Sequence, residues 1–159
     1  MSSLNAHSWT EYERSLLFIG PLLNLVKLTE LYRYNLFAQR YIEAEINDIV
    51  VGGEPDGLIA SGYYEPEIPF FAFAEYKRQH DPNGDPAGQA LGAMLVGQTL
   101  NQQANPLYGC YIIGRDWNFM VLDGIHYTIS RDYSGLSDEV FEILRILKAL
   151  KEIIIEITA

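Results

Sequence analysis

The first pattern along the chain is a run of apolar residues at helical spacing between Trp9 and Arg33. Most of its members recur at intervals that place them on one face of a helix: Leu16, Ile19, Leu22, Leu23, Val26 and Leu31. Gly20-Pro21 interrupts this pattern, and a proline inside a helix removes a backbone hydrogen bond and clashes with the preceding turn. We therefore expect a helix that is kinked or broken near Ile19.

The next segments have the features of strands. Apolar and polar residues alternate from Phe37 to Asp48, with Glu43 and Glu45 on the polar side, as in a half-exposed strand. Gly52-Gly53 then predicts a turn, because two adjacent glycines favour backbone reversal. A second strand is expected from Pro55 to Ala60.

A third strand, from Phe70 to Arg78, follows a loop over residues 62–69 that contains two prolines. It begins with an uninterrupted apolar run, residues 70–74, and ends in charged residues. Such a run is typical of a strand that is covered on both faces. We therefore expect this strand in the middle of a sheet.

The second half of the chain begins with a loop, His80 to Gly84, that leads into a helix. Asp85-Pro86 has the sequence of a helix cap followed by a proline at the first helical position. The helix is expected to run to about Gln102. It is rich in glycine and alanine, which would let it lie close against a sheet.

Three more strands and a last helix complete the chain. The strands are expected at Tyr108 to Ile113, Asn118 to Leu122 and His126 to Ser130. The helix is expected from Asp138 to about Ile157, with Ser137 as its cap. Its apolar residues exceed one stripe, so we expect one face on the sheet and another on a second subunit of a homodimer.

This order of helix, three strands, helix, strands and helix predicts an α/β fold with a mixed sheet flanked by helices. The 159 residues suffice for one hydrophobic core, so we expect a single domain over residues 1–159. Hydrophobic residues make up 48% and charged residues 20% of the chain, which is ordinary for a folded protein and excludes a disordered one.

The cysteine content and the N-terminal sequence indicate a compartment. Cys110 is the only cysteine, so an intramolecular disulfide is excluded, and its apolar neighbours predict a buried, inert thiol. A reducing cytoplasm is the natural setting for such a chain. The start of the sequence lacks the blocks of a signal peptide, and Gly20, Pro21 and Asn24 break the apolar run from Leu16 to Val26, so no membrane span is expected.

Three charged residues at the ends of the second and third strands carry the candidate chemistry. Eighteen residues separate Asp56 from Glu75, and Lys77 follows two positions later. If these strands pair as a hairpin, the two carboxylates meet at one end of the sheet, and period-two geometry puts Lys77 on the face of Glu75. Paired carboxylates suit Mg²⁺ or Mn²⁺, and a lysine beside them can orient or deprotonate a metal-bound water.

The sequence resembles the PD-(D/E)XK nuclease superfamily in Pro55-Asp56 followed by Glu75-Tyr76-Lys77. The order of elements from about residue 9 to 114 is similar too, since members of that superfamily have a restriction-endonuclease-like αβββαβ core with these motifs on strands two and three. The resemblance implies a metal-dependent nuclease that hydrolyses phosphodiester bonds of DNA. It implies Mg²⁺ or Mn²⁺ at Asp56 and Glu75, and a catalytic Lys77.

The resemblance implies two further site residues. Many members place a glutamine on the helix after the Glu-x-Lys motif, and Gln89 stands at that position. Many also have a glutamate on the first helix that contributes to the metal site, and here Glu11 and Glu13 are both candidates. The Glu-x-x-Arg sequence resembles the first helix of several bacterial nuclease domains, which favours Glu11.

A net charge of -10 opposes binding to nucleic acid, because affinity for the phosphate backbone depends on lysine and arginine. It indicates weak DNA binding, or binding assisted by a partner. Taken alone, Asp56-Gly57 would be an ordinary turn and the Glu75-x-Lys77 motif a solvated strand end. The alternative function is therefore a catalytically inactive nuclease-fold protein that acts as an interaction or accessory subunit.

Overall fold

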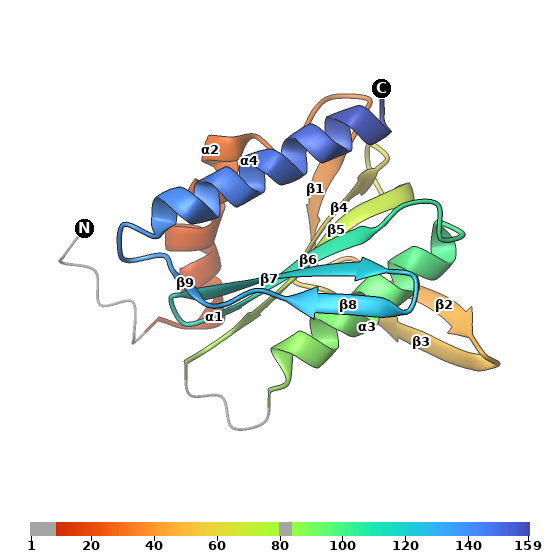
Figure 1. The fold of residues 1–159 in the computed structure, drawn as a ribbon, viewed down its shortest axis with the longest axis horizontal. Coiled ribbons are helices and arrows are strands. Elements are labelled where there is room, and N and C mark those ends of the chain that lie inside the picture. The colour runs from red at the N-terminus through yellow and green to blue at the C-terminus, as the bar shows by residue number, and fades with distance from the viewer. Residues whose placement is uncertain (1–8, 80–83) are drawn as a thin grey trace.

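The computed structural model describes residues 9–79 and 84–159, and within them it is an α/β structure built on a mixed sheet (Figure 1). The main sheet has seven strands in the order β1-β4-β5-β6-β7-β8, and β9 pairs with β7. All its neighbouring strands are antiparallel except β5 and β6. Their bounds are β1 Asn35–Ala38, β4 Gly57–Ser61, β5 Glu67–Lys77, β6 Leu107–Ile113, β7 Asp116–Asp123, β8 His126–Ile129 and β9 Tyr133–Ser134.

Helices cover both faces of this sheet (Figure 1). On one face lie the N-terminal helical segment and α4, and on the other lie α3 and a separate two-stranded hairpin. The N-terminal segment comprises α1 Glu11–Arg14, the π-helical turn η2 Ser15–Ile19 and α2 Gly20–Val26. The other elements are β2 Ile42–Ile46, β3 Ile49–Gly53, α3 Pro86–Leu100 and α4 Val140–Ile157.

A hydrophobic core lies on each face of the sheet. The first joins α2 and α4 to the sheet and includes Ile19, Val26, Ile143 and Trp117. The second joins α3 and the β2–β3 hairpin to the opposite face and includes Ile42, Ala44, Met94 and Phe73. The expectation that the third predicted strand is central is confirmed, because β5 lies between β4 and β6 and contributes to both cores.

The position of α3 over β5 is fixed at both ends of the helix. At its start, Asp85 Oδ1 accepts a hydrogen bond from the Gly88 amide at 2.9 Å, as the predicted cap requires. At its end, the buried Asn101 side chain donates to the Phe70 carbonyl at 2.7 Å and accepts from the Phe70 amide at 2.9 Å. Gly97 between them faces the Phe73 ring without a Cβ to hold the layers apart.

The predicted break in the first helix takes the form of a π turn. Residues 15–19 are π-helical directly before Gly20-Pro21, and the Gly20 amide donates to the Ser15 carbonyl five residues earlier. This wider turn makes room for a proline that an unbroken α-helix would not accept. The helical segment also ends earlier than expected, since Lys27 adopts a left-handed conformation after Val26.

One strand prediction and one turn prediction between Phe37 and Gly53 are wrong. The single strand from Phe37 to Asp48 is two strands in different sheets, β1 and β2, separated near Gln39, which has φ 51°. The turn lies at Asn47-Asp48, both with positive φ, while Gly52-Gly53 belongs to β3. Glu43 and Glu45 do point to solvent from β2, as their alternation predicts.

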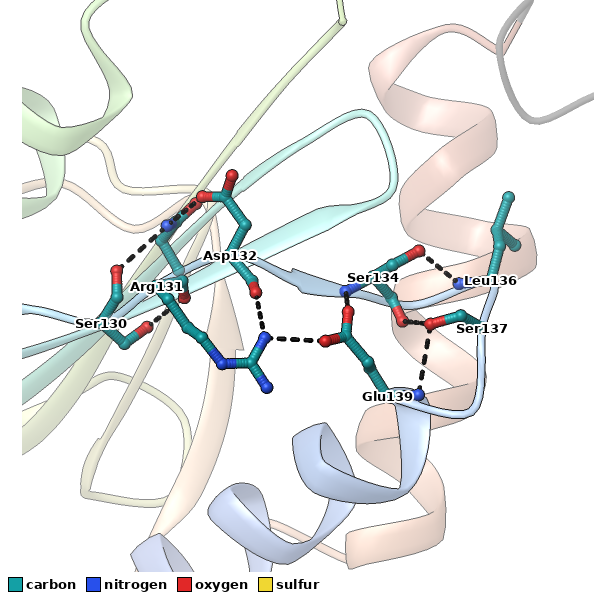
Figure 2. Close-up of polar contacts among 8 residues, drawn as sticks. Ser130, Arg131, Asp132, Ser134, Leu136, Ser137 and Glu139 are labelled. Atoms are coloured by element: carbon teal, nitrogen blue, oxygen red, sulfur yellow. Dashed lines mark hydrogen bonds and ion pairs between the residues drawn. The ribbon is translucent and has the colours of Figure 1, made fainter.

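A polar network ties the start of α4 to the preceding loop (Figure 2). Glu139 Oε2 accepts from the Ser134 amide at 2.7 Å, and Glu139 Oε1 accepts from Arg131 Nη1 at 2.7 Å. Ser137 Oγ accepts from the Glu139 amide at 3.2 Å. The prediction of Ser137 as the cap is wrong, because the helix begins at Val140 and Glu139 occupies the N-cap position without a capping side-chain hydrogen bond.

The outer face of α4 is mostly charged rather than apolar. Arg145, Lys148, Glu152 and Glu156 are exposed, and the apolar residues beside the buried Ile143, Leu147 and Ile154 are half-buried. Phe141, 59% exposed, is the large apolar side chain on this helix that faces solvent. The surplus of apolar positions in the sequence thus flanks one buried face and does not form a second apolar face.

Three further observations bear on the sequence predictions. Desolvation and then the charge of Glu75 raise the pKa of the Cys110 thiol to about 12, although this cysteine is half-buried rather than fully buried as predicted. Of the predicted loop from His80 to Gly84, residues 80–83 lie outside the described part of the chain. In residues 9–79 and 84–159, the structure contains no helix with the length and apolar character needed to cross a membrane.

Candidate functional site

The pairing of β4 with β5 brings Asp56 and Glu75 together. Gly57 pairs with Ala74 in the antiparallel register, so the preceding Asp56 comes to the level of Glu75. The Asp56 carboxylate is held there by the Tyr76 amide, which donates to Asp56 Oδ2 at 2.7 Å. The two carboxyl groups therefore meet at one end of the sheet, as the sequence predicts.

Glu75 is a buried carboxyl group with a second carboxyl group beside it. It is 8% exposed, and burial together with the charge of Asp56 raises the pKa of Glu75 to about 7. The positive charge of Lys77 acts in the opposite direction, and a hydrogen bond with Asp56 adds to the upward shift. A divalent cation between these groups would stabilise both carboxylates, because its charge offsets their repulsion.

Glu75 and Lys77 face a cleft beneath α3, on the same side of β5 as Phe73. The cleft has a volume of about 330 Å³ and is lined by Asp56, Glu75, Lys77 and Gln89 together with the end of β3 and the segment after it. Tyr76 points to the other face and packs in the core with α2 and α4. The structure thus gathers the four residues Asp56, Glu75, Lys77 and Gln89 around one cavity.

Gln89 enters this cleft from the first turn of α3, as its position in the sequence predicts. The residue is exposed, and its backbone amide donates to the Asp85 carbonyl at 2.9 Å at the start of the helix. An exposed amide at the rim can contact a substrate in the cleft, but it is not held against the carboxylates.

The two first-helix glutamates occupy different environments. Glu13 completes a capping box, since its Oε2 accepts from the Thr10 amide at 2.7 Å and its own amide donates to Thr10 Oγ1 at 3.2 Å. Glu11 instead lines a second cleft of about 550 Å³, which Asp56 also lines. The charge of Glu11 also adds to the raised pKa of Glu75, after burial and the charge of Asp56.

Arg14 is a site residue that the sequence analysis did not identify. Its side chain is 1% exposed, and its Nη1 donates to the Lys77 carbonyl at 2.6 Å. The same carbonyl accepts from the Gly114 amide at 3.1 Å, so the end of β5 is held from two sides. Burial lowers the pKa of Arg14 and the charge of Glu11 opposes this. The available signal was a charged residue within the apolar stripe of the first helix.

The carboxylates present fit a hard divalent cation that keeps several water ligands. Within residues 9–79 and 84–159, no three Asp, Glu, His or Cys side chains form a complete ligand group by themselves. Asp56 and Glu75 supply two carboxylates, and Mg²⁺ is commonly bound by one or two carboxylates plus waters and phosphate oxygens. The donor set therefore suits a metal that shares its coordination with a substrate.

Positive side chains gather at the end of β5, although the chain as a whole has a net charge of -10. In the described part of the chain, Lys77 and Arg78 form no ion pair, whereas the arginines that do pair with carboxylates lie elsewhere: Arg33, Arg40, Arg115, Arg131 and Arg145. Arg14 adds a buried positive charge behind Lys77. Three cations thus stand at the end of β5, although they form no stripe in the sequence.

Comparison with known proteins assigns no family. The sequence matches no protein-family model and no curated protein. A crystal structure of the protein SSO0001 is similar over 91% of this chain, with 16% sequence identity and a TM-score of 0.29. The chain spans 59% of the length of that protein. A similarity this low supports no statement about fold or function.

Proposed function

We propose that this chain is a metal-dependent nuclease that hydrolyses phosphodiester bonds of DNA at Asp56, Glu75 and Lys77. The observation that carries the proposal is the meeting of Asp56 with the buried Glu75 at one end of β4 and β5, with Lys77 in the same cleft. Few structural roles require a buried carboxyl group, a second carboxyl group and a lysine around one cavity.

The arrangement of the elements supports a restriction-endonuclease-like αβββαβ core. The N-terminal helical segment precedes β1, β4 and β5, which are adjacent and antiparallel, and α3 then leads to β6, which is parallel to β5. In this interpretation the β2–β3 hairpin is an insertion between the first and second core strands. The PD-(D/E)XK resemblance places its two motifs at the start of β4 and the end of β5.

Each residue has a role that follows from its position. Asp56 and Glu75 would hold Mg²⁺ or Mn²⁺, with Glu11 contributing through its charge from the adjoining cleft. When bound, the metal would stabilise charge on the phosphate and lower the pKa of a water. Lys77 orients or deprotonates the attacking water and stabilises charge that develops on the phosphate. Gln89 orients the substrate or the water from the rim.

The partners follow from the charge and from the surface. With a net charge of -10, binding to DNA is weak or assisted by another protein, and the local cations Lys77 and Arg78 provide the available contacts. A homodimer through α4 would use Phe141, which is exposed among charged neighbours. Light scattering of the parent and Phe141→Lys over a range of micromolar concentrations tests this, and equal monomer masses would contradict it.

The second candidate function is that of an inactive accessory subunit with the same fold. The acidic net charge favours it, because a protein without catalysis needs no nucleic-acid surface. Lys77 beside two carboxylates opposes it, because burying Glu75 next to the charge of Asp56 is unfavourable and an inactive protein gains nothing from this arrangement.

Metal binding and cleavage together decide between these functions. We expect calorimetry to show Mn²⁺ or Mg²⁺ binding that is lost in the Asp56→Ala, Glu75→Ala double variant, and low-salt assays with Mn²⁺ to show cleavage of DNA by the parent alone. Glu54→Ala is a matched control, because this exposed carboxylate lines the same cleft but forms no metal-ligand group with Asp56 and Glu75 in the described part of the chain. Metal binding that survives in the double variant would place the metal elsewhere and refute the proposed site.

A further inference from the structure

Two clefts share Asp56 as a lining residue. The first, beneath α3, contains Glu75 and Lys77. The second lies between the N-terminal helical segment and the β1–β4 edge of the sheet, and its lining includes Glu11, Tyr12, Gln39 and Arg78. Asp56 is the last residue of the link between β3 and β4, and it forms part of the wall of both cavities.

The lining of the second cleft includes an aromatic ring, a cation and an amide. Tyr12 is 75% exposed. Arg78 is exposed and forms no ion pair with the residues that the structure describes. Gln39 is exposed, and its backbone amide donates to the Asp56 carbonyl at 3.3 Å, which fixes the two segments to each other. A ring, a guanidinium and an amide are the groups that hold a base, a phosphate and a sugar in proteins that bind single strands.

We propose that the second cleft binds the nucleotide next to the scissile phosphate, with Arg78 on its phosphate and Tyr12 stacked on its base. This inference rests on the proposed nuclease function. A phosphodiester held at Asp56 belongs to a continuous chain, so the neighbouring nucleotide must leave the first cleft on one side. The second cleft adjoins the first at Asp56 and is large enough, at about 550 Å³, to accept it.

The substrate class that fits this cleft is single-stranded DNA or a frayed end. A base can stack on Tyr12 only when it is not stacked within a duplex. The charge of the protein also favours a single strand. A duplex carries about one negative charge per 1.7 Å, so a protein of net charge -10 would repel it over a long surface. A single strand needs only the local cations Lys77 and Arg78.

Kinetics on matched single-stranded and duplex oligonucleotides tests the inference. We expect the parent to prefer the single strand. We expect Tyr12→Ala and Arg78→Gln each to raise KM for the single strand about tenfold with kcat nearly unchanged, as for loss of one stacking or phosphate contact. Arg78→Gln is also expected to reduce the salt dependence of binding by about one counterion. Tyr64→Ala and Arg145→Gln are controls, since both side chains are exposed outside the two clefts.

The outcomes separate the two proposals. If the parent cleaves and both cleft variants keep its KM, or if the parent cleaves duplex and single strand equally, the second cleft is not the nucleotide site although the nuclease function stands. If the parent cleaves no substrate with Mg²⁺ or Mn²⁺, the nuclease function fails. Fluorescence anisotropy of a labelled single strand in Mn²⁺ then tests the cleft directly, and equal binding by the parent, Tyr12→Ala and Arg78→Gln would refute it.

Discussion

Arg14 Nη1 donates a hydrogen bond to the Lys77 carbonyl oxygen at 2.6 Å, across 63 positions of the sequence. The bond joins the end of α1 to the last residue of β5, and it lies two residues beyond Glu75. Since the Gly114 amide donates to the same oxygen, the backbone that carries Lys77 is held from the first helix and from the turn after β6. Arg14 therefore helps to hold the backbone that carries Lys77 and does not itself line the cleft.

Arg14→Met is expected to lower kcat about tenfold while KM and Mn²⁺ affinity change little, because a charge-assisted hydrogen bond of about 1.5–3 kcal/mol no longer holds the Lys77 backbone. Arg14→Lys retains a donor and is expected to recover part of the rate. Steady-state kinetics and calorimetry measure these effects, and circular dichroism checks the fold. A folded Arg14→Met variant with the parental kcat would show that the bond serves only the structure.

The fold was predicted best where the pattern was long and regular. Helix α3 and strands β4 to β8 lie within a few residues of their expected places, because strand alternation, apolar runs and the Asp85 cap agree with the tertiary structure. The β2–β3 hairpin was missed because β1 and β2 form one alternating run in the sequence. The chain turns between them at Gln39, which has a positive φ, and a glutamine does not indicate a positive φ in a sequence.

The site was predicted as far as local geometry allows. Hairpin pairing and period-two alternation bring Asp56, Glu75 and Lys77 together, and both rules can be applied to sequence alone. The preference for Glu11 over Glu13 came from the resemblance of the Glu-x-x-Arg sequence, and the structure adds that Glu13 is engaged in a capping box with Thr10. Arg14 and the second cleft depend on the packing of the first helix against β1 and β5, which no periodicity specifies.

Gly97→Ala is expected to destabilise the protein by about 1–3 kcal/mol, because a Cβ there would lie 2.6 Å from two atoms of the buried Phe73 ring. Gly92 on the same helix is a matched control, since a Cβ at that position meets nothing within 4 Å. Gly92→Ala is expected to stabilise by up to about 1 kcal/mol through helix propensity. Urea unfolding measures both, and equal midpoint shifts would contradict close packing of α3 on β5.

The Glu139 carboxylate gives a pH-dependent contribution to stability. Its pKa lies below the ordinary value of 4.5, first because of the Ser134 amide and then because of Arg131. A lowered folded-state pKa means that the stabilisation is present above pH 4.5 and is lost as the pH falls further. We expect Glu139→Gln to be less stable than the parent at neutral pH and to approach it in acid, while Glu156→Gln differs little at either pH. A constant difference across this range would contradict the assignment.

Variants of Lys77 distinguish the nuclease function from the inactive accessory function, because Lys77 acts in catalysis without holding the metal. It lines the cleft beside Glu75 and contributes a positive charge that lowers the pKa of Glu75, but an ammonium is not a metal ligand. Removing Lys77 therefore changes metal affinity only indirectly. It raises the pKa of Glu75, and it removes the repulsion between the ammonium and the bound cation. Measurements at about pH 8.5, where Glu75 is mostly ionised, limit the first effect.

At that pH we expect Lys77→Ala to bind Mn²⁺ and to cleave DNA about a hundredfold more slowly, a loss of about 3 kcal/mol of transition-state stabilisation. Lys77→Arg is expected to recover only part of the rate, because guanidinium keeps the charge but does not deprotonate and is bulkier and planar. Full recovery with arginine would mean that the charge alone acts, and no recovery would mean that proton transfer or the exact shape of the ammonium decides. If Lys77→Ala cleaves at the parental rate, the residue has no catalytic role and the accessory function becomes the better account of the fold.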